Sequence, residues 1–421
     1  MTDTVTFIHA ADLHIGAPFK GLRAVSERWA DRLTQAVPQA FEGLVGAALA
    51  HRVDFVVIAG DCFDAAEPSF GDYLRFVDGL ARLDKAGIPV FLCAGNHDPW
   101  PTWQQRFTAL PANTHLFPAD GPGYFCYQRQ GRPVAVLAGR SFPAAVWPQD
   151  TAVATGLTRA AAQQTLQVRA PFCVGVLHTG LDWDESAAPV DPRVLGAAGM
   201  DYWALGHMHR RRVVDDPADP HIVYSGCLQG RALNETGPHG ANLVTLQKGR
   251  PNSLEFLPLA SVVWACPSVD VASAQTVADM AERVVAALNL LNASAYCPLM
   301  IERVTLTGAT PLHAELQQAP TLEGLRARIN DAAPQFFCDT LIDATVMPID
   351  RERLEREGLF PAAFLAACRK ESHDRAGELA YLKAAFADEG IELPEDIAGS
   401  LDEMEAEAQN MVLDLLVRGY E

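Results

Sequence analysis

Short apolar runs rich in β-branched residues alternate with longer amphipathic stretches through the first 250 residues of the chain. Apolar runs of this length predict buried strands, and amphipathic stretches with a period near 3.6 residues predict helices between them. Five of the predicted strands are 5–10, 55–59, 89–93, 172–177 and 202–205. Because strands and helices alternate, the pattern predicts a layered α/β fold.

Two helices and two hairpins complete this part of the prediction. A helical region covers 27–51 and is expected to be interrupted near Pro38, since proline favours the first turn of a fresh helix. A second helix runs from Ser69, a predicted N-cap, to Gly87, a predicted stop. The hairpins pair 124–128 with 134–138 and 212–214 with 222–224, and a strand over 243–246 is expected to close the domain.

Each of the five strands leads directly into a polar motif. The motifs are Asp12-Leu13-His14, Gly60-Asp61-Cys62-Phe63-Asp64, Gly95-Asn96-His97-Asp98, a lone His178, and Gly206-His207-Met208-His209. Any one of them alone could be an ordinary turn or, for the lone histidine, a hydrogen-bonded core residue. Ligands gather at the carboxyl ends of strands in α/β folds, so the five together predict convergence on one spot. Carboxylates, imidazoles and one carboxamide suit manganese, iron or zinc, and the set predicts a two-metal hydrolase.

With these motifs the sequence resembles the calcineurin-like metallophosphoesterase superfamily, and the residues between them narrow the resemblance to SbcD/YhaO-type DNA repair exonuclease subunits. The narrower match rests on residues 11–14 continuing into 17–22, on Phe63 before Asp64, and on the segments 224–231 and 234–237. It covers roughly the first 250 residues. Two positions depart from the usual pattern: Cys227 stands where serine or asparagine is commoner, and His239 stands where lysine is usual.

The resemblance implies a two-sheet β-sandwich flanked by helices and assigns roles to the motif residues. One metal is held by Asp12, His14 and His209, the other by Asn96, His178 and His207, and Asp61 bridges both. The metals are two divalent ions, manganese above all. His97 protonates the leaving sugar oxygen or orients the phosphate, while Asp64 fixes its ring and raises its pKa.

The rest of the chain is expected to form two further parts beyond a metallophosphoesterase domain at 1–250. A turn-rich seam at 248–251 precedes a small α/β capping domain at 251–349, with strands at 261–266, 298–306 and 336–346 and helices at 271–291 and 312–331. Residues 350–421 form an acidic helical extension. Its apolar stripe either packs on the chain's own cap or, as the resemblance implies, docks on an SMC-like coiled-coil ATPase of the SbcC/YhaN type; the stripe is Met404, Ala408, Met411, Val412 and Leu415.

The net charge of −19 counts against a nucleic-acid enzyme, but its distribution weakens the objection. Residues 371–421 hold fourteen acidic and three basic side chains and therefore account for −11 of that charge. Local basic residues near the motifs are predicted DNA contacts, namely Lys20, Arg210, Arg211 and Arg231. The nine cysteines show no Cys-x-x-Cys spacing, and neither a signal peptide nor a membrane span is evident, so a cytoplasmic protein is expected.

These observations favour a two-metal-dependent DNA nuclease, an exonuclease that could also act as an endonuclease, working in repair as a homodimer with the ATPase. Two alternatives stay open. One is a small-molecule phosphodiesterase or phosphatase on the same scaffold, and the other is a non-catalytic scaffold of an ATPase complex. The chain has no Gly-Lys dipeptide and so no Walker A loop, which places any ATP-driven step in another protein.

Overall fold

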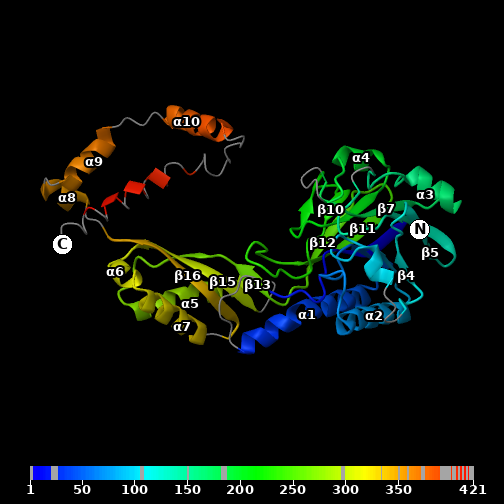
Figure 1. Ribbon diagram of the computed structural model, residues 1–421, viewed down its shortest axis with the longest axis horizontal. Helices are drawn as coiled ribbons and strands as arrows, with labels where there is room; N and C mark the ends of the chain where they lie inside the picture. Colours follow the sequence, from blue (N-terminus) through cyan, green and yellow to red (C-terminus); the bar gives the residue numbers. More distant parts are fainter. Residues whose placement is uncertain are drawn as a thin grey trace. The chain divides into compact units, whose positions relative to one another are not determined.

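The computed structural model describes most of the chain and divides it into two compact units (Figure 1). The described residues are 3–19, 27–104, 109–148, 151–181, 187–294, 299–332, 334–348, 351–357, 360–370, 375–388, 400, 404–405, 408–409, 412–413 and 416. The first unit takes in Met1–Ala265, Leu290–Glu302 and Gln335–Asp339. The second takes in Cys266–Asn289, Arg303–Pro334 and Thr340–Glu421.

The first unit is built around two six-stranded sheets. One has the order β12-β11-β1-β2-β3-β4, and its strands are β1 (Thr4–Ala10), β2 (Phe55–Ala59), β3 (Val90–Cys93), β4 (Thr114–Leu116), β11 (Gly240–Gln247) and β12 (Ser253–Pro258). β1 to β4 are mutually parallel, whereas β11 pairs antiparallel with β1. The sheet therefore continues past residue 246 into β12, a strand that the sequence pattern did not predict.

The other sheet has the order β5-β6-β7-β8-β10-β9. Its strands are β5 (Gly123–Arg129), β6 (Arg132–Gly139), β7 (Phe172–His178), β8 (Tyr202–Gly206), β9 (Arg212–Val213) and β10 (Ile222–Tyr224). β6, β7, β8 and β10 run parallel, and the two predicted hairpins, β5–β6 and β9–β10, are both present. The mixture of parallel strands with antiparallel edges is typical of large α/β sheets.

Apolar side chains form three layers around these sheets. Between the sheets, Phe7, Phe55 and Phe91 pack against Val174 and Tyr202. The outer face of the first sheet is covered by α1 (Glu27–His51) and α2 (Phe70–Lys85), which lie side by side in Figure 1. The outer face of the second sheet is covered by α3 (Arg159–Leu166) and α4 (Pro192–Ala197). The predicted helix-flanked two-sheet architecture is confirmed.

The predicted interruption of the first helix is wrong, because α1 runs unbroken through Pro38. Proline in a helix interior removes one hydrogen bond and crowds the preceding turn. Val37 and Phe41, on either side of it, are both buried against the first sheet. This apolar packing compensates for the lost hydrogen bond. In α2 the prediction is confirmed: Ser69 Oγ accepts from the Asp72 N–H at 3.1 Å, and Gly87 follows the helix with φ at +72°.

A short parallel strand pair anchors the start of the middle region within the first unit. β13 (Val263–Ala265) pairs with residues 300–302 of β15 (Met300–Ala309). Trp264 and Ile301, one from each strand, pack with Trp29 and Leu33 of α1 and with Phe337. The large apolar area of these side chains holds both strands against α1.

The second unit contains the rest of the predicted α/β region and the helical extension. Its elements are β14 (Ser268–Asp270), α5 (Val277–Ser294), α6 (His313–Leu316), α7 (Ala319–Ala332), β16 (Phe336–Val346), α8 (Arg351–Glu357), α9 (Phe360–Lys370) and α10 (Arg375–Asp388), several of which begin or end in the first unit. β14 was not predicted, and the single helix expected at 312–331 is two, α6 and α7. The division at residues 250 and 349 stays a prediction.

The apolar stripe predicted near the C-terminus falls partly outside the described residues, since Met411 and Leu415 are not among them. Met404 and Val412 are 50 % and 38 % exposed, whereas Leu413 is buried and packs with Leu354 and Leu365. Among the described residues, no helix is both long enough and apolar enough to cross a membrane.

Candidate metal centre

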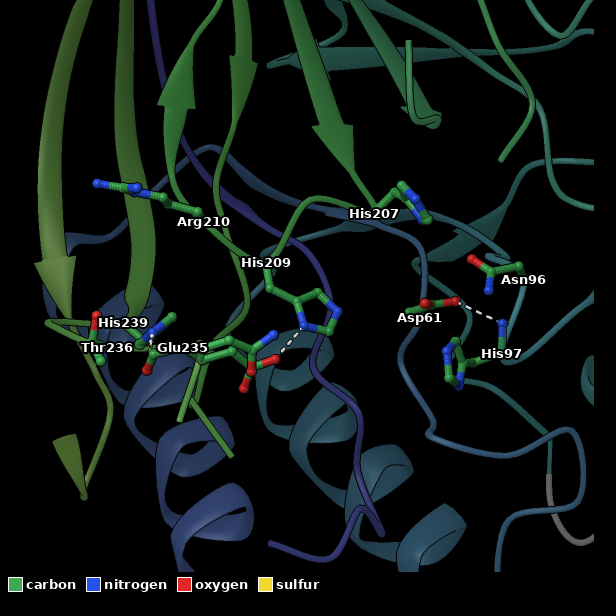
Figure 2. A pocket seen from close by; sticks show the side chains of 10 residues that line it. Asp61, Asn96, His97, His207, His209, Arg210, Glu235, Thr236 and His239 are labelled. Atoms are coloured by element: carbon green, nitrogen blue, oxygen red, sulfur yellow. Dashed lines mark hydrogen bonds and ion pairs between the residues drawn. The ribbon is translucent and has the colours of Figure 1, made fainter. Parts of the chain in front are cut away.

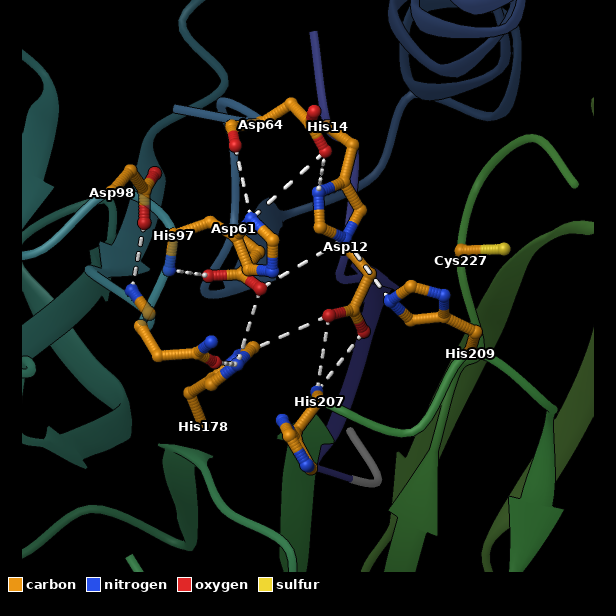
Figure 3. Close-up of polar contacts among 12 residues, drawn as sticks. Asp12, His14, Asp61, Asp64, His97, Asp98, His178, His207, His209 and Cys227 are labelled. Carbon is orange, nitrogen blue, oxygen red and sulfur yellow. Dashed lines mark hydrogen bonds and ion pairs between the residues drawn. The ribbon is translucent and has the colours of Figure 1, made fainter. Parts of the chain in front are cut away.

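The polar motifs meet where five strands end, at one edge of the two sheets (Figure 3). The loops that follow β1 and β2 are hydrogen-bonded to each other: the Asp12 N–H donates to Gly60 O at 3.1 Å, and the His14 N–H donates to Asp61 O at 3.0 Å. From the second sheet, the His207 N–H donates to the Asp12 carboxylate. These bonds bring residues nearly 200 positions apart in sequence into one cluster.

One set of donors converges around Asp12, His14 and His209, whose ligand atoms lie within 4.8 Å of one another. The Nε2 atoms of the two histidines are 3.0 Å apart and come from different sheets. Two nitrogen lone pairs aimed at one point leave room for a shared cation. The structure thus brings together the three residues that the sequence assigned to one metal.

A second set surrounds the Asp61 carboxylate. Its Oδ2 lies 3.4 Å from His178 Nε2 and 3.8 Å from His14 Nε2, so it stands between the two sets. Asn96 Oδ1 is 2.9 Å from His178 Nε2. The ring of His207 stands edge-on to the His178 ring, with centroids 5.4 Å apart, and it lines the adjoining cavity. The predicted members of the second site are therefore also close together.

Several of these residues have a strained backbone. Asp12, His14 and Asp61 have φ between +45° and +51°, and His207 has φ at +102°. Residues other than glycine rarely adopt this region, and when they do they cluster at functional sites. The strain favours a binding role for these positions over ordinary turns.

Two glycines permit the close approach of the motif loops. A Cβ on Gly95 would stand 2.1 Å from Asp61 Oδ1, and a Cβ on Gly206 would stand 1.9 Å from the Ala59 carbonyl oxygen. Both distances are far below van der Waals contact. Glycine is required at these positions because the backbone itself touches the cluster.

Burial keeps the imidazoles neutral and therefore able to bind a cation. Loss of hydration lowers the pKa of His14 and of His178 to about 4. Burial also raises the pKa of Asp12 to about 7. A divalent ion would reverse that rise by favouring the charged carboxylate. Neutral imidazoles, carboxylates and a carboxamide oxygen fit manganese, iron or zinc.

Behind the first cluster lie two carboxylates that contact its histidines. The His209 Nδ1 atom is 2.5 Å from Glu235 Oε1, and the His14 Nδ1 atom is 3.1 Å from Asp64 Oδ1. Burial raises the pKa of Glu235, but hydrogen bonds from His209 and from the Arg231 N–H lower it to about 2. Sequence reasoning missed Glu235, although it stands in the Asn-Glu-Thr-Gly segment that carried the resemblance.

The structure changes the picture for Asp64 and Arg231. The contact of Asp64 with His97 is made by its backbone carbonyl, 2.9 Å from His97 Nδ1, while its carboxylate faces His14 and Arg231. Arg231 is only 8 % exposed and donates from Nη1 to Asp64 Oδ1 at 2.8 Å. Its side chain is thus part of the cluster's support, which differs from the predicted contact with DNA.

A second residue that the sequence did not single out is Asp98. It is fully buried, and its carboxylate accepts backbone N–H groups from Gly95 and Cys62 at 2.8 Å and from Phe63 at 3.3 Å. Burial and the nearby Asp61 charge raise the pKa of Asp98, and the three N–H donors act in the opposite direction. Asp98 ties the second motif to the third.

A cavity of about 500 Å³ opens beside the cluster (Figure 2). It is lined by Asp61, Asn96, His97, His207, His209, Arg210, Asn234, Glu235, Thr236 and His239. Arg211, another predicted DNA contact, is bonded to Asn242 Oδ1 at 2.6 Å and lies over the Phe256 ring. Lys20 lies outside the described residues. Arg210 is therefore the predicted basic residue that borders the cavity.

Comparison with known proteins agrees with this geometry. The profile of the calcineurin-like phosphoesterase family matches residues 5–211, and that of the metallophosphoesterase YhaO middle domain matches residues 264–346. The uncharacterized metallophosphoesterase YhaO of Bacillus subtilis is 33 % identical over 291 residues, which cover 68 % of this chain and 67 % of that protein. The chain belongs to the calcineurin-like phosphoesterase family. Within that family it is of the SbcD/YhaO type.

Two further relatives carry names from DNA metabolism. The SbcD component of the nuclease SbcCD from Escherichia coli K12 is 28 % identical, covering 59 % of this chain and 67 % of its own length. The DNA double-strand break repair protein Mre11 of Aeropyrum pernix is 31 % identical, covering 56 % of each chain. Family membership and the donor cluster together make the protein a metal-dependent phosphoesterase with a dimetal centre.

Proposed function

We propose that this phosphoesterase is a two-metal DNA nuclease, acting on phosphodiester bonds as an exonuclease and also as an endonuclease. The observation that supports it most is the convergence of seven predicted ligands from both sheets beside an open cavity. The relatives named as a nuclease and as a break-repair protein support DNA as the substrate class.

In this proposal the ligands keep the assignment made from the sequence. Asp12, His14 and His209 hold one ion, Asn96, His178 and His207 hold the other, and Asp61 contacts both. Bound ions of this kind, preferably manganese, supply a water of lowered pKa and stabilise charge on the phosphoryl oxygens. The neutral Asn96 ligand leaves net positive charge for an anionic substrate.

His97 is proposed to act on the substrate. Its side chain is 43 % exposed and lines the cavity, while its backbone N–H donates to Asp61 Oδ1 at 2.9 Å. The Asp64 carbonyl accepts from Nδ1, which fixes the ring and leaves Nε2 for the substrate. In the protonated form, Nε2–H can donate to the leaving oxygen or to a phosphoryl oxygen. Arg210, at the same cavity, is proposed as a phosphate contact.

The assembly calls for a partner, because the chain has no nucleotide-binding loop. We propose an SMC-like coiled-coil ATPase of the SbcC/YhaN type, a homodimer of this chain, and a cytoplasmic location. The exposed apolar residues Met404 and Val412 support a docking surface in the C-terminal part. Co-purification of the tagged full chain with such an ATPase, compared with a chain ending at residue 370, tests this part.

The activity is tested with purified full-length protein and manganese on three substrates. These are linear double-stranded DNA, single-stranded DNA and bis-p-nitrophenyl phosphate, each with Asp61→Asn as the inactive control. We expect cleavage of DNA by the wild type only. Cleavage of the small diester without any DNA cleavage would refute the nuclease proposal.

One observation favours a small-molecule phosphodiesterase as a second candidate. Arg210 is the one lysine or arginine among the described residues that line the cavity, and the chain as a whole carries a charge of −19. A DNA-binding surface ordinarily supplies more positive charge than this. The same three-substrate assay separates the two candidates.

A further inference from the structure

The two halves of the metal centre differ in what stands behind their histidines. Behind His14 and His209 are the Asp64 and Glu235 carboxylates, at 3.1 and 2.5 Å from the respective Nδ1 atoms. Behind His178 is the backbone carbonyl of Ala59, 3.0 Å from its Nδ1. One side is therefore supported by two negative charges and the other side by a neutral dipole.

Arg231 joins the two carboxylates into a single unit. Its Nη1 donates to Asp64 Oδ1 at 2.8 Å, and its backbone N–H donates to Glu235 Oε2 at 2.6 Å. Asp64 follows β2, whereas Glu235 lies in the loop after β10, 171 positions later in the chain. Both oxygens of Glu235 are used, one for His209 and one for Arg231.

These contacts determine which nitrogen of each imidazole is available. A carboxylate at Nδ1 keeps the proton there, so the Nε2 lone pair is left for a cation. The two Nε2 atoms indeed point at one another, 3.0 Å apart. A charged acceptor also makes the ring more basic and thus a stronger ligand than a carbonyl acceptor does.

The inner ligands differ in the same sense. The site with His14 and His209 includes the Asp12 carboxylate, whereas the site with His178 includes the neutral Asn96 carboxamide. Asp61 stands between the two and favours neither strongly, at 3.8 Å from His14 Nε2 and 3.4 Å from His178 Nε2. Negative charge, near and far, is concentrated on one side.

We propose that Asp64, Glu235 and Arg231 are positioning residues that make the Asp12–His14–His209 site the tighter of two unequal metal sites. The Asn96–His178–His207 site is then the one that loses its ion first when metal is scarce. The proposal rests on the proposed ligand assignment. It concerns metal affinity, however, and does not depend on whether DNA is the substrate.

The test is a manganese titration of the full-length, metal-stripped protein, followed by calorimetry and by the electron paramagnetic resonance of free manganese. We expect two steps of different affinity in the wild type. In Glu235→Gln, one carboxylate oxygen becomes an NH₂ group facing donors, so the tight step should weaken about 10- to 100-fold while the weak step stays unchanged. Arg231→Leu should weaken the same step, and rescue by Glu235→Asp should be partial.

The matched control is Glu315→Gln, which removes the same charge from an exposed position on α6. It should leave both steps as in the wild type. Thermal unfolding of each stripped variant establishes that the fold is intact. Two equal steps in the wild type would overturn the proposal, as would a Glu235→Gln protein that loses the weak step instead. If two unequal steps appear but DNA is not cleaved, the nuclease proposal fails and this one stands.

Discussion

A buried carboxyl group in the first unit gives a quantitative prediction about stability and pH. Glu302 lies on β15 opposite Ala265, next to the Trp264 and Ile301 pair that packs on α1. Its side chain is 0 % exposed, and neither carboxyl oxygen has a hydrogen-bond partner in the described part of the structure. Burial raises the pKa of Glu302 from 4.5 to about 8.

The size of the effect follows from that shift. Between pH 4.5 and pH 8 the folded protein keeps a proton that the unfolded chain releases, so stability falls as the pH rises. Each pH unit is worth about 1.4 kcal/mol, which gives a total on the order of 5 kcal/mol. Below this window the term vanishes because Glu302 is neutral in both states. Above the window the term is constant because it is charged in both.

Replacing Glu302 with Gln keeps the shape of the side chain and removes its charge. We expect the variant to match the wild type near pH 4.5 and to be more stable by several kcal/mol at pH 8.5. Urea unfolding of metal-stripped protein, followed by tryptophan fluorescence at four pH values, measures the difference. Glu315→Gln, exposed and remote from β15, is the control for a general charge effect. A stabilisation by Glu302→Gln that is the same at every pH would refute the reasoning.

Three further predictions concern the metal centre. Asp61→Asn should lose the bridging charge, bind less than two manganese ions per chain and lose hydrolysis; full manganese-stimulated activity would contradict the ligand assignment. His97→Ala should keep both ions yet cleave DNA about 10²- to 10⁴-fold more slowly, with bis-p-nitrophenyl phosphate less affected because its leaving group needs little protonation. Loss of the ions would make His97 a ligand instead. Gly95→Ala should displace Asp61, because the added Cβ would stand 2.1 Å from Oδ1, and metal analysis should show reduced binding; normal binding would show that the loop can move.

The strands and their motifs could be predicted because the signal is local. An apolar run such as 55–59 ends where the polar residues begin, and the structure places β2 at those residues. The same logic found the other four motif strands within one or two residues. The general rule that ligands gather at strand ends then sufficed to predict which side chains converge.

What the sequence did not predict depends on contacts between distant segments. Arg231 looked like a phosphate contact because an arginine beside glycines is usually exposed, yet its partner Asp64 is 167 positions away. Glu235 has no strand of its own to mark it, and its role appears only when His209 is seen beside it. Pro38 is a helix breaker locally, but the packing of Val37 and Phe41 outweighs that preference.

The strained backbone of the centre has a consequence for how metal is bound. Left-handed residues such as Asp12 and Asp61 persist only when their surroundings hold them, and here the surroundings are hydrogen bonds between the motif loops themselves. The His97 N–H fixes Asp61, and the His207 N–H fixes Asp12. Because protein contacts already impose this geometry, a cation entering the cluster does not have to order the loops. The difference between the two sites then comes from the charge around each, which is why substitutions at Glu235 should change affinity without unfolding the centre.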